Sequence, residues 1–205
     1  MPQPPDPAAV SVDVRRALAE DFGSGDVTAD LLPVDAQAQA RVIARETAIV
    51  CGRPWFDACF RELDPRTVVD WRVAEGARIG ADGIVCVLRG NARALVGPER
   101  CALNFLQTLS ATATITAQYV DAVRGTHATI LDTRKTVPGL RLAQKYAVRC
   151  GGAANHRIGL FDAILIKENH IAAAGSLTAA AGAACARHPE LLLEVEVENF
   201  AELDE

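Results

Sequence analysis

The stretch Ala128-Thr-Ile-Leu-Asp132, followed at once by Thr133-Arg134-Lys135, sets the fold of the second half of this 205-residue chain. The first run is apolar and rich in β-branched residues, which predicts a buried strand. Pro138-Gly139 interrupts the loop behind it, and the apolar spacing from Leu140 to Cys150 predicts a helix. Two further strands are predicted at 162–166 and 191–198, with an alanine-rich helix between them at 176–187.

Strands that alternate with helices in this order are expected to be parallel and joined by helical crossovers. In such architectures the ligand lies at the carboxyl ends of the strands, and in barrels that face is catalytic. Arg134 and Lys135 follow the first strand, Lys167 follows the second, and Glu196 or Glu198 lies at the end of the third. We therefore expect these side chains on one rim.

The first half of the chain has a different pattern. A helix is expected over 12–20, and strands are expected over 40–50, over 68–73, and over 84–87 with 92–96, joined at glycine-bearing turns. Pro98 before Glu99 is typical of a helix start, and this helix should reach about Val123 and link two domains. The predicted fold is α/β: an N-terminal α+β sandwich domain over 1–110, then the first part of a parallel α/β barrel over 111–205.

The charge of the chain is unevenly distributed. It has 21 Lys and Arg against 26 Asp and Glu, a formal net charge of −5, yet residues 132–170 hold seven basic and only three acidic residues. Cations kept together in an acidic protein indicate an anionic small ligand. Nucleic-acid binding is not expected, because the chain is acidic and no motif of basic and aromatic surface residues is present.

Each cationic group has an alternative interpretation. Arg134 and Lys135 taken alone would fit a solvated loop equally well. Lys167 ends an apolar strand, where lysine is rarely buried without a partner. We expect a bound anion as that partner, and the alternative is an ion pair with Glu196 or Asp132.

Two arginines outside these strands, Arg157 and Arg100, have features that indicate a use in binding. Arg157 follows His156, and a planar guanidinium can hold a carboxylate through two parallel hydrogen bonds. Without a ligand, His156 and His170 would be core or capping residues, and no direct metal ligand is predicted. Arg100 lies in the first turn of a helix, which is unfavourable for a cation and indicates a use elsewhere.

Several short motifs occur in a recognisable order. They are Glu20-Asp21-Phe-Gly-Ser-Gly-Asp26-Val-Thr28, Glu99-Arg100-Cys-Ala-Leu-Asn104, Asp132-Thr-Arg-Lys-Thr-Val-Pro-Gly-Leu-Arg141, Gln144-Lys-Tyr-Ala-Val148, Gly151-Gly152, Asn155-His-Arg157, Ile166-Lys-Glu-Asn-His170 and Glu194-Val-Glu-Val-Glu198. Together they resemble the quinolinate phosphoribosyltransferases, also called nicotinate-nucleotide pyrophosphorylases (carboxylating). The resemblance runs from about Ala17 to the last residue.

The resemblance implies a transferase of NAD biosynthesis that joins quinolinate to phosphoribosyl pyrophosphate, the latter with Mg2+. It implies catalytic roles for Lys135, which would face the donor phosphates, for Lys167, and for Glu196, which would lie near the ribose and the metal. It also implies a homodimer or higher oligomer in which Arg100 enters the neighbouring site. The substrate-binding residues implied are Arg100, Thr133, Arg134, Lys135, His156, Arg157, Lys167 and Glu196.

The family's barrel has further strands, so the resemblance places the donor-phosphate loops beyond Glu205. The 205-residue chain by itself is then expected to aggregate or to associate through open strand edges, and to show no turnover. Two alternatives remain open. One is a fragment that binds a dicarboxylate or a partner chain without catalysis, and the other is a related phosphoribosyltransferase-like protein associated with molybdenum uptake.

Composition agrees with a globular protein of the cytoplasm. Half of the residues are hydrophobic, and the six cysteines are scattered without a Cys-x-x-Cys pair, so reduced thiols are expected. Residues 1–7 lack the basic and apolar regions of a signal peptide and are expected to form a disordered leader. The alanine-rich stretch 171–186 is too short and too polar to span a bilayer.

Overall fold

The computed structural model describes residues 2–205, which fold as two compact units that divide after Asn155. Each unit is described by itself. Met1, the first residue of the expected leader, lies outside the described residues, and residues 2–6 have no regular secondary structure. The domain boundary expected at residue 110 falls within a long helix, Glu99–Ala122, and stays a prediction.

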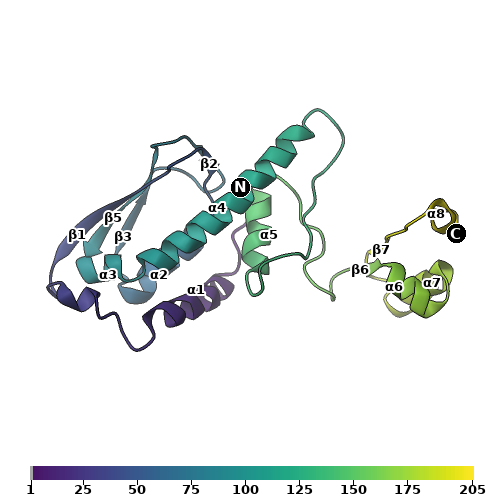
Figure 1. The fold of residues 1–205 in the computed structure, drawn as a ribbon, viewed down its shortest axis with the longest axis horizontal. Coiled ribbons are helices and arrows are strands. Elements are labelled where there is room, and N and C mark those ends of the chain that lie inside the picture. Colours follow the sequence, from purple (N-terminus) through teal and green to yellow (C-terminus); the bar gives the residue numbers. More distant parts are fainter. Residues whose placement is uncertain (1) are drawn as a thin grey trace. The chain divides into compact units, whose positions relative to one another are not determined.

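An antiparallel sheet forms one layer of the N-terminal unit (Figure 1). Strand β5 (Ile84–Asn91) lies between β1 (Gln37–Ile43) and β3 (Val68–Trp71). Residues 85–88 of β5 are all buried, as expected of a central strand that is covered on both faces. The predicted antiparallel α+β arrangement is thereby confirmed.

Two details of the sheet differ from the sequence predictions. The strand expected over 40–50 is interrupted, and its second part, β2 (Ala48–Ile49), pairs with β4 (Arg78–Ile79) in a separate antiparallel ribbon. The strand expected over 92–96 is wrong, because this segment forms helix α3 (Ala92–Val96). Its N-cap is Asn91, whose side-chain oxygen accepts the backbone N–H groups of the next turn and so favours a helix.

Helices of the N-terminal unit pack on the sheet and against one another, and α4 runs past both α2 and α5 (Figure 1). The helices expected near 12–20, 98–123 and 140–150 are confirmed, whereas α2 has no counterpart in the sequence predictions. The bounds of the helical elements are α1 (Pro7–Phe22), the short 3-10 helix η1 (Ala29–Leu31), α2 (Arg53–Leu63), α4 (Glu99–Ala122) and α5 (Arg141–Cys150).

The core of this unit is centred on α2. Trp55 is 1% exposed, and its indole N–H donates to a carboxylate oxygen of Asp13 at 3.0 Å, which joins α1 to α2. Its ring centroid lies 5.9 Å from that of Tyr146 on α5. One aromatic side chain therefore ties together three helices that are distant in sequence.

The end of α5 lies very close to α4. A side chain at Gly151 would place its Cβ 2.5 Å from the carbonyl oxygen of Ala113, so only glycine fits there. Gly152 follows with a φ of +91°, a conformation that favours glycine. The helix predicted to reach Cys150 ends there, and Gly151 and Gly152 fix where the chain leaves α5.

All six cysteines are free thiols, and Cys185 is the exposed one. Burial raises the pKa of Cys59 to about 12 and that of Cys86 to about 12. These two thiols are therefore protonated and unreactive at neutral pH.

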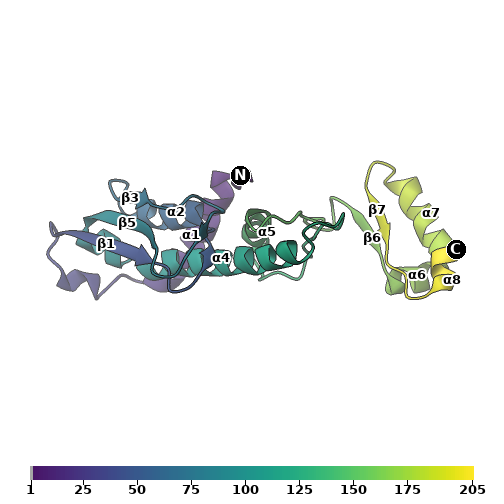
Figure 2. The same cartoon turned by 90° about the horizontal axis from the view of Figure 1, so that it is seen from above.

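The C-terminal unit has a parallel pair of strands with helices beside it (Figure 2). Strands β6 (Ile164–Ile166) and β7 (Leu193–Val195) pair in parallel, which confirms the predicted crossover architecture for this pair. The crossover contains two helices. The alanine-rich α7 was predicted from the sequence, and α6 was not. The helices are α6 (Glu168–Ala174), α7 (Leu177–Arg187) and α8 (Phe200–Asp204).

The buried strand expected at 128–132 is wrong. Among the described residues this segment pairs through a single parallel bridge, between Leu131 and Ala154, and Leu131 is 52% exposed. A run of apolar, β-branched residues favours a strand only when neighbouring strands pair with it on its edges. The segment passes directly into the cationic loop.

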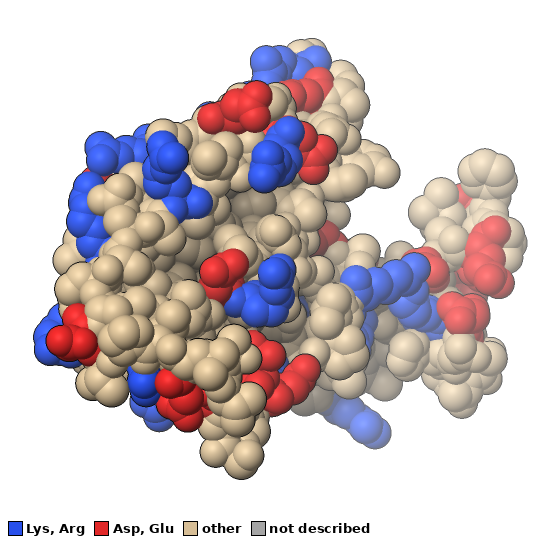
Figure 3. Space-filling view, turned by 60° about the vertical axis from the view of Figure 1, so that its left-hand side comes forward, with Lys and Arg blue, Asp and Glu red and all other residues tan. Residues whose placement is uncertain are grey.

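Charged side chains of both signs are interspersed on the face shown in Figure 3. The basic residues of the chain are therefore not gathered there into a single positive surface. In the part of the chain that the structure describes, no helix is both long and apolar enough to cross a membrane.

Candidate active site

The loop after residue 132 is held in a tight local conformation. The backbone N–H of Lys135 donates to the hydroxyl oxygen of Thr133 at 3.0 Å, and the N–H of Thr136 donates to the carbonyl of Arg134 at 3.0 Å. These local bonds turn the chain within a few residues. Thr133 therefore has a structural role in the loop, whatever else its hydroxyl binds.

Arg134 retains unused hydrogen-bonding capacity. Its side-chain Nε is shielded from solvent and has no hydrogen-bond partner among the described residues. A buried N–H without a partner is costly and in native proteins usually marks a place where a ligand, water or another group binds. Arg134 is therefore a candidate for an anion contact in the N-terminal unit.

A buried ion pair anchors the beginning of this loop, and the sequence analysis missed it. The Lys145 ammonium lies 2.5 Å from a carboxylate oxygen of Asp132, and the two side chains are only 3% and 6% exposed. Asn155 donates from Nδ2 to the other carboxylate oxygen at 2.7 Å and to the carbonyl of Lys145 at 2.9 Å. The network fixes the residue before Thr133 and the residue before His156.

No periodic signal in the sequence distinguishes Lys145 from a surface lysine. It lies next to the buried Tyr146 on α5, and its burial depends on Asp132, which is remote in the sequence. The one signal in the sequence is that Lys145 belongs to the motif Gln144-Lys-Tyr-Ala-Val148. We regard Lys145 as a positioning residue for the loop.

In the C-terminal unit, Lys167 and Glu196 lie at the carboxyl ends of the two parallel strands. Lys167 Nζ is 2.5 Å from a carboxylate oxygen of Glu196, and the side chains are 40% and 53% exposed. From the sequence, a bound anion was expected beside Lys167, with an ion pair to Glu196 or Asp132 as the alternative. The structure contains the ion pair with Glu196. An exposed pair of this kind exchanges partners at little cost, so an incoming anion can compete for the ammonium.

His156 and Arg157 contribute to the same unit. His156 Nε2 lies 2.7 Å from a carboxylate oxygen of Glu194. Glu194 is in β7, two residues before Glu196. Arg157 makes one long contact, from Nη1 to the carbonyl of Ala163 at 3.4 Å. The guanidinium therefore still has N–H groups to offer a carboxylate.

His170 is a capping residue, which is one of the two structural roles expected for it from the sequence. Its Nδ1 accepts the backbone N–H of Lys167 at 3.1 Å, at the first turn of α6. The contact fixes the backbone at Lys167 where β6 passes into the helix.

Arg100 lies on α4 beside a cavity of the N-terminal unit. The cavity is also lined by Glu20 and Asp21, the acidic pair of the first sequence motif. No hydrogen bond or ion pair of the Arg100 side chain is found within the described chain. Its guanidinium is therefore available, and the expectation that it serves a neighbouring subunit stays a prediction.

The expected residues thus form two groups. Thr133, Arg134 and Lys135 belong to the N-terminal unit, whereas His156, Arg157, Lys167 and Glu196 belong to the C-terminal unit. Each group offers guanidinium or ammonium donors suited to carboxylate or phosphate oxygens. The expectation of a single rim that contains both groups stays a prediction.

Several proteins of known name are similar to this chain over most of its length. A nicotinate-nucleotide pyrophosphorylase (carboxylating) of Mycobacterium leprae is 44% identical, over 93% of this chain and 69% of its own length. A probable nicotinate-nucleotide pyrophosphorylase (carboxylating) of Synechocystis is 43% identical, over 92% of this chain. The structure of the Francisella tularensis nicotinate-nucleotide pyrophosphorylase superposes with a TM-score of 0.94 at 44% identity, covering 98% of this chain and 71% of that one.

Family matches divide the chain in two. Residues 26–110 match the quinolinate phosphoribosyl transferase N-terminal domain, and residues 112–205 match the C-terminal domain. Fold and sequence together therefore place the chain in the phosphoribosyl transferase class. The chain belongs to the quinolinate phosphoribosyltransferase family. It spans 64% of the length of the Synechocystis relative.

Proposed function

We propose that the natural protein containing this chain, called the full-length protein below, converts quinolinate and phosphoribosyl pyrophosphate to nicotinate mononucleotide, pyrophosphate and CO2. The observation that carries the proposal is the likeness, over more than nine-tenths of the chain, to proteins named for this reaction. A cytoplasmic location remains a prediction that accompanies it.

Charge neutralisation is the first task of such a site. Quinolinate carries two carboxylates, and the donor carries three phosphoryl-type groups, so the two substrates repel each other in water. In the proposed site Arg134, Arg157 and Lys167 bind the dicarboxylate, and Lys135 faces the donor phosphates. The unused donors of Arg134 and Arg157 support this assignment.

The chemistry then follows from positioning. The pyridine nitrogen forms a bond to the anomeric carbon of ribose while the carbon–oxygen bond to pyrophosphate breaks, and pyrophosphate takes the electron pair. The Glu196 carboxylate stabilises the positive charge that develops on the sugar. The bond from ring C2 to its carboxylate then breaks, CO2 leaves, and the electron pair on C2 next to the positive nitrogen takes up a proton from water. No protein nucleophile is needed.

The donor would carry Mg2+ bound to its pyrophosphate. The Glu196 carboxylate at the end of β7 is half-exposed, and its oxygens are ligands of the type that Mg2+ accepts. We name no direct metal ligand in this chain. The ion would supply charge neutralisation of the leaving pyrophosphate.

Replacing Arg134 or Arg157 by lysine should weaken quinolinate binding by about 1.5–3 kcal/mol, because lysine cannot make two parallel hydrogen bonds to one carboxylate. Calorimetric titration of the full-length protein with quinolinate measures the effect. Arg187→Lys on α7 is the matched control and should bind as the parent does. Unchanged affinity in both site variants would remove these arginines from the dicarboxylate site.

Arg100 provides a test of assembly. If it completes the site of a neighbouring subunit, mixing inactive Arg100→Ala protein with inactive Lys167→Ala protein should restore part of the activity through hybrid dimers. Each hybrid then holds one intact site. If verified subunit exchange brings no recovery, Arg100 acts in its own chain or has no role.

A direct assay separates this function from the molybdenum-associated alternative. The full-length protein is supplied with phosphoribosyl pyrophosphate, Mg2+ and quinolinate, and nicotinate mononucleotide is measured by chromatography. The proposal requires the product to appear only when both substrates are present. If the folded protein forms no nicotinate mononucleotide, the better interpretation is the related phosphoribosyltransferase-like protein associated with molybdenum uptake.

A further inference from the structure

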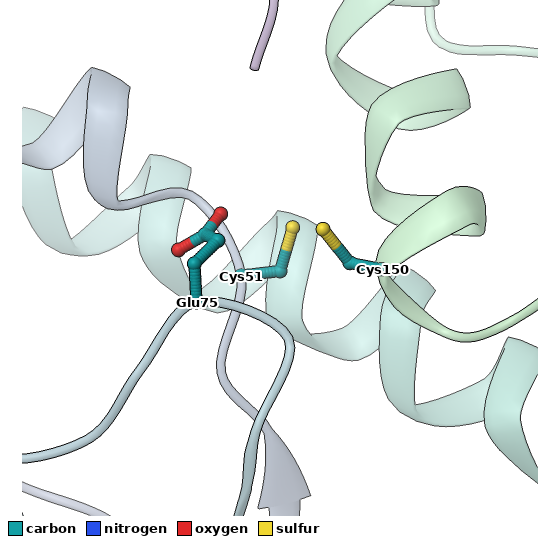
Figure 4. A group of neighbouring side chains, drawn as sticks. All are labelled: Cys51, Glu75 and Cys150. Carbon is teal, nitrogen blue, oxygen red and sulfur yellow. The ribbon is translucent and has the colours of Figure 1, made fainter. Parts of the chain in front are cut away.

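Two buried thiols and one buried carboxylate converge in the N-terminal unit, outside the residues assigned to the reaction (Figure 4). They belong to Cys51, Glu75 and Cys150, and one ligand atom from each lies within 4.8 Å of the other two. Cys51 is fully buried, and Glu75 and Cys150 are each 9% exposed. In Figure 4 the two sulfur atoms point toward one another, with the carboxylate beside them.

Three separate elements hold these groups in place. Cys51 directly precedes α2, and its backbone N–H donates to the Ser110 hydroxyl on α4 at 2.9 Å. Cys150 is the last residue of α5. Glu75 lies in the turn between β3 and β4. The ligand atoms are therefore fixed by the fold rather than carried on a mobile loop.

The Glu75 carboxylate is oriented but not neutralised. Its two oxygens accept the backbone N–H groups of Gly52 at 2.8 Å and Arg53 at 3.2 Å, at the beginning of α2. Within residues 2–205 it makes no ion pair. A buried carboxylate is costly unless it is paired or coordinates a metal, and metal-binding carboxylates are typically held by such outer hydrogen bonds.

We propose that Cys51, Glu75 and Cys150 form a binding site for a thiophilic divalent cation of the Zn2+ type. Two sulfur ligands and one oxygen ligand suit Zn2+, whereas Mg2+ and Ca2+ prefer oxygen ligands alone. A tetrahedral ion with Zn–S bonds of about 2.3 Å holds two sulfurs about 3.8 Å apart, so shifts of about 1 Å or less complete the site.

The bound ion would join the start of α2, the β3–β4 turn and the end of α5. Binding releases the two thiol protons to solvent, and two thiolates with one carboxylate leave a net charge of about −1 around a dication. The N-terminus of α2, which already donates to Glu75, partly offsets that charge. The site is therefore structural: it links elements of the core and takes no part in the transfer reaction.

The test begins with the unaltered full-length protein, reduced and freed of metal with a chelator. Co2+ is added as a spectroscopic probe, since a thiolate-bound tetrahedral Co2+ ion gives a charge-transfer band and strong visible absorption. We expect one equivalent to bind with both features, and Zn2+ to displace it. Absence of the charge-transfer band would overturn the proposal, and so would a Cys51–Cys150 disulfide in protein that binds no metal.

Variants then locate the ion. Cys150→Ser should lower Zn2+ affinity, measured by competition with a chromophoric chelator, by more than about 100-fold, because loss of an outer-shell partner alone typically costs 10- to 100-fold. Cys59→Ser, a buried thiol outside the group, is the matched control and should bind Zn2+ as the parent does. Equal loss in both variants, or in neither, would refute the assignment.

A measurement on the parent protein covers the case in which a variant does not fold. Zn2+ should slow alkylation of Cys51 and Cys150, followed by mass spectrometry under mild denaturation, and leave the rates of Cys185 unchanged. Protection that is absent, or that falls on other cysteines, would contradict the site. None of these readouts depends on turnover, so they stand apart from the proposed function.

Discussion

Replacement of Lys145 by alanine should destabilise the N-terminal unit by about 3–5 kcal/mol. Lys145 and Asp132 are 3% and 6% exposed and lie 2.5 Å apart, so the variant removes a buried ammonium from direct contact with a buried carboxylate. The neutral Asn155 amide, which also donates to Asp132, cannot replace that positive charge. Urea unfolding followed by circular dichroism measures the change in the free energy of unfolding.

Two further variants show that burial is the cause. Arg72→Ala breaks the Arg72–Asp70 ion pair, which is about as short at 2.6 Å but half exposed, and should cost about 1 kcal/mol or less. Combining Lys145→Met with Asp132→Asn removes both charges and should restore part of the lost stability. A small effect of Lys145→Ala, comparable to that of Arg72→Ala, would mean that the pair is not buried in solution.

Lys167→Ala should lower kcat/KM of the full-length protein by about 100- to 1,000-fold, the range seen when one preorganised electrostatic contact is removed from an active site. The variant removes a cation from the proposed dicarboxylate site and leaves Glu196 unpaired beside the substrate. Steady-state kinetics with quinolinate measure the loss. Folding should be little affected, because both side chains of the pair are substantially exposed.

A cation elsewhere in the same unit provides the control for Lys167. Arg187 lies in the last turn of α7 and is not part of any expected contact, so Arg187→Ala should keep its kcat/KM within about twofold of the parent value. Lys167→Ala protein that is fully active, with native circular dichroism, would exclude Lys167 from the reaction.

The sequence predicted those elements whose signals are local. Pro98 with Glu99 marks the beginning of α4 as expected. Strand β7 lies within the stretch 191–198 that was expected to be a strand, and it pairs in parallel as expected. In each case the residues that determine the element lie within it or next to it.

Failures occurred where distant residues decide. The segment 128–132 has the composition of a strand, but its described partner is one bridge at Leu131. Helix α2 is a different case, because its signals are local: Pro54 lies in its first turn, and Trp55, Phe56, Cys59 and Phe60 are buried at helical spacing. It could have been predicted from these residues, and the remote Glu75 adds a cap by accepting the N–H groups of Gly52 and Arg53.

The candidate site divides in the same way. Motifs identified Arg134, Lys167 and Glu196, and of the partners considered for Lys167 the structure contains the Glu196 carboxylate. The sequence could not predict the burial of Lys145 or the cluster of Cys51, Glu75 and Cys150, because both arise only when the fold brings together residues far apart in the sequence. Burial, which converts an ordinary lysine or thiol into a distinctive one, is a property of the folded chain.

The fate of one carbon atom tests the central claim most directly. Quinolinate labelled in the carboxylate carbon at C2 is incubated with the full-length protein, phosphoribosyl pyrophosphate and Mg2+, and labelled CO2 and nicotinate mononucleotide are measured together. The account predicts that both appear in equal amounts and that neither forms without the phosphoribosyl donor. Label retained in the nucleotide, or released without nucleotide, would contradict it.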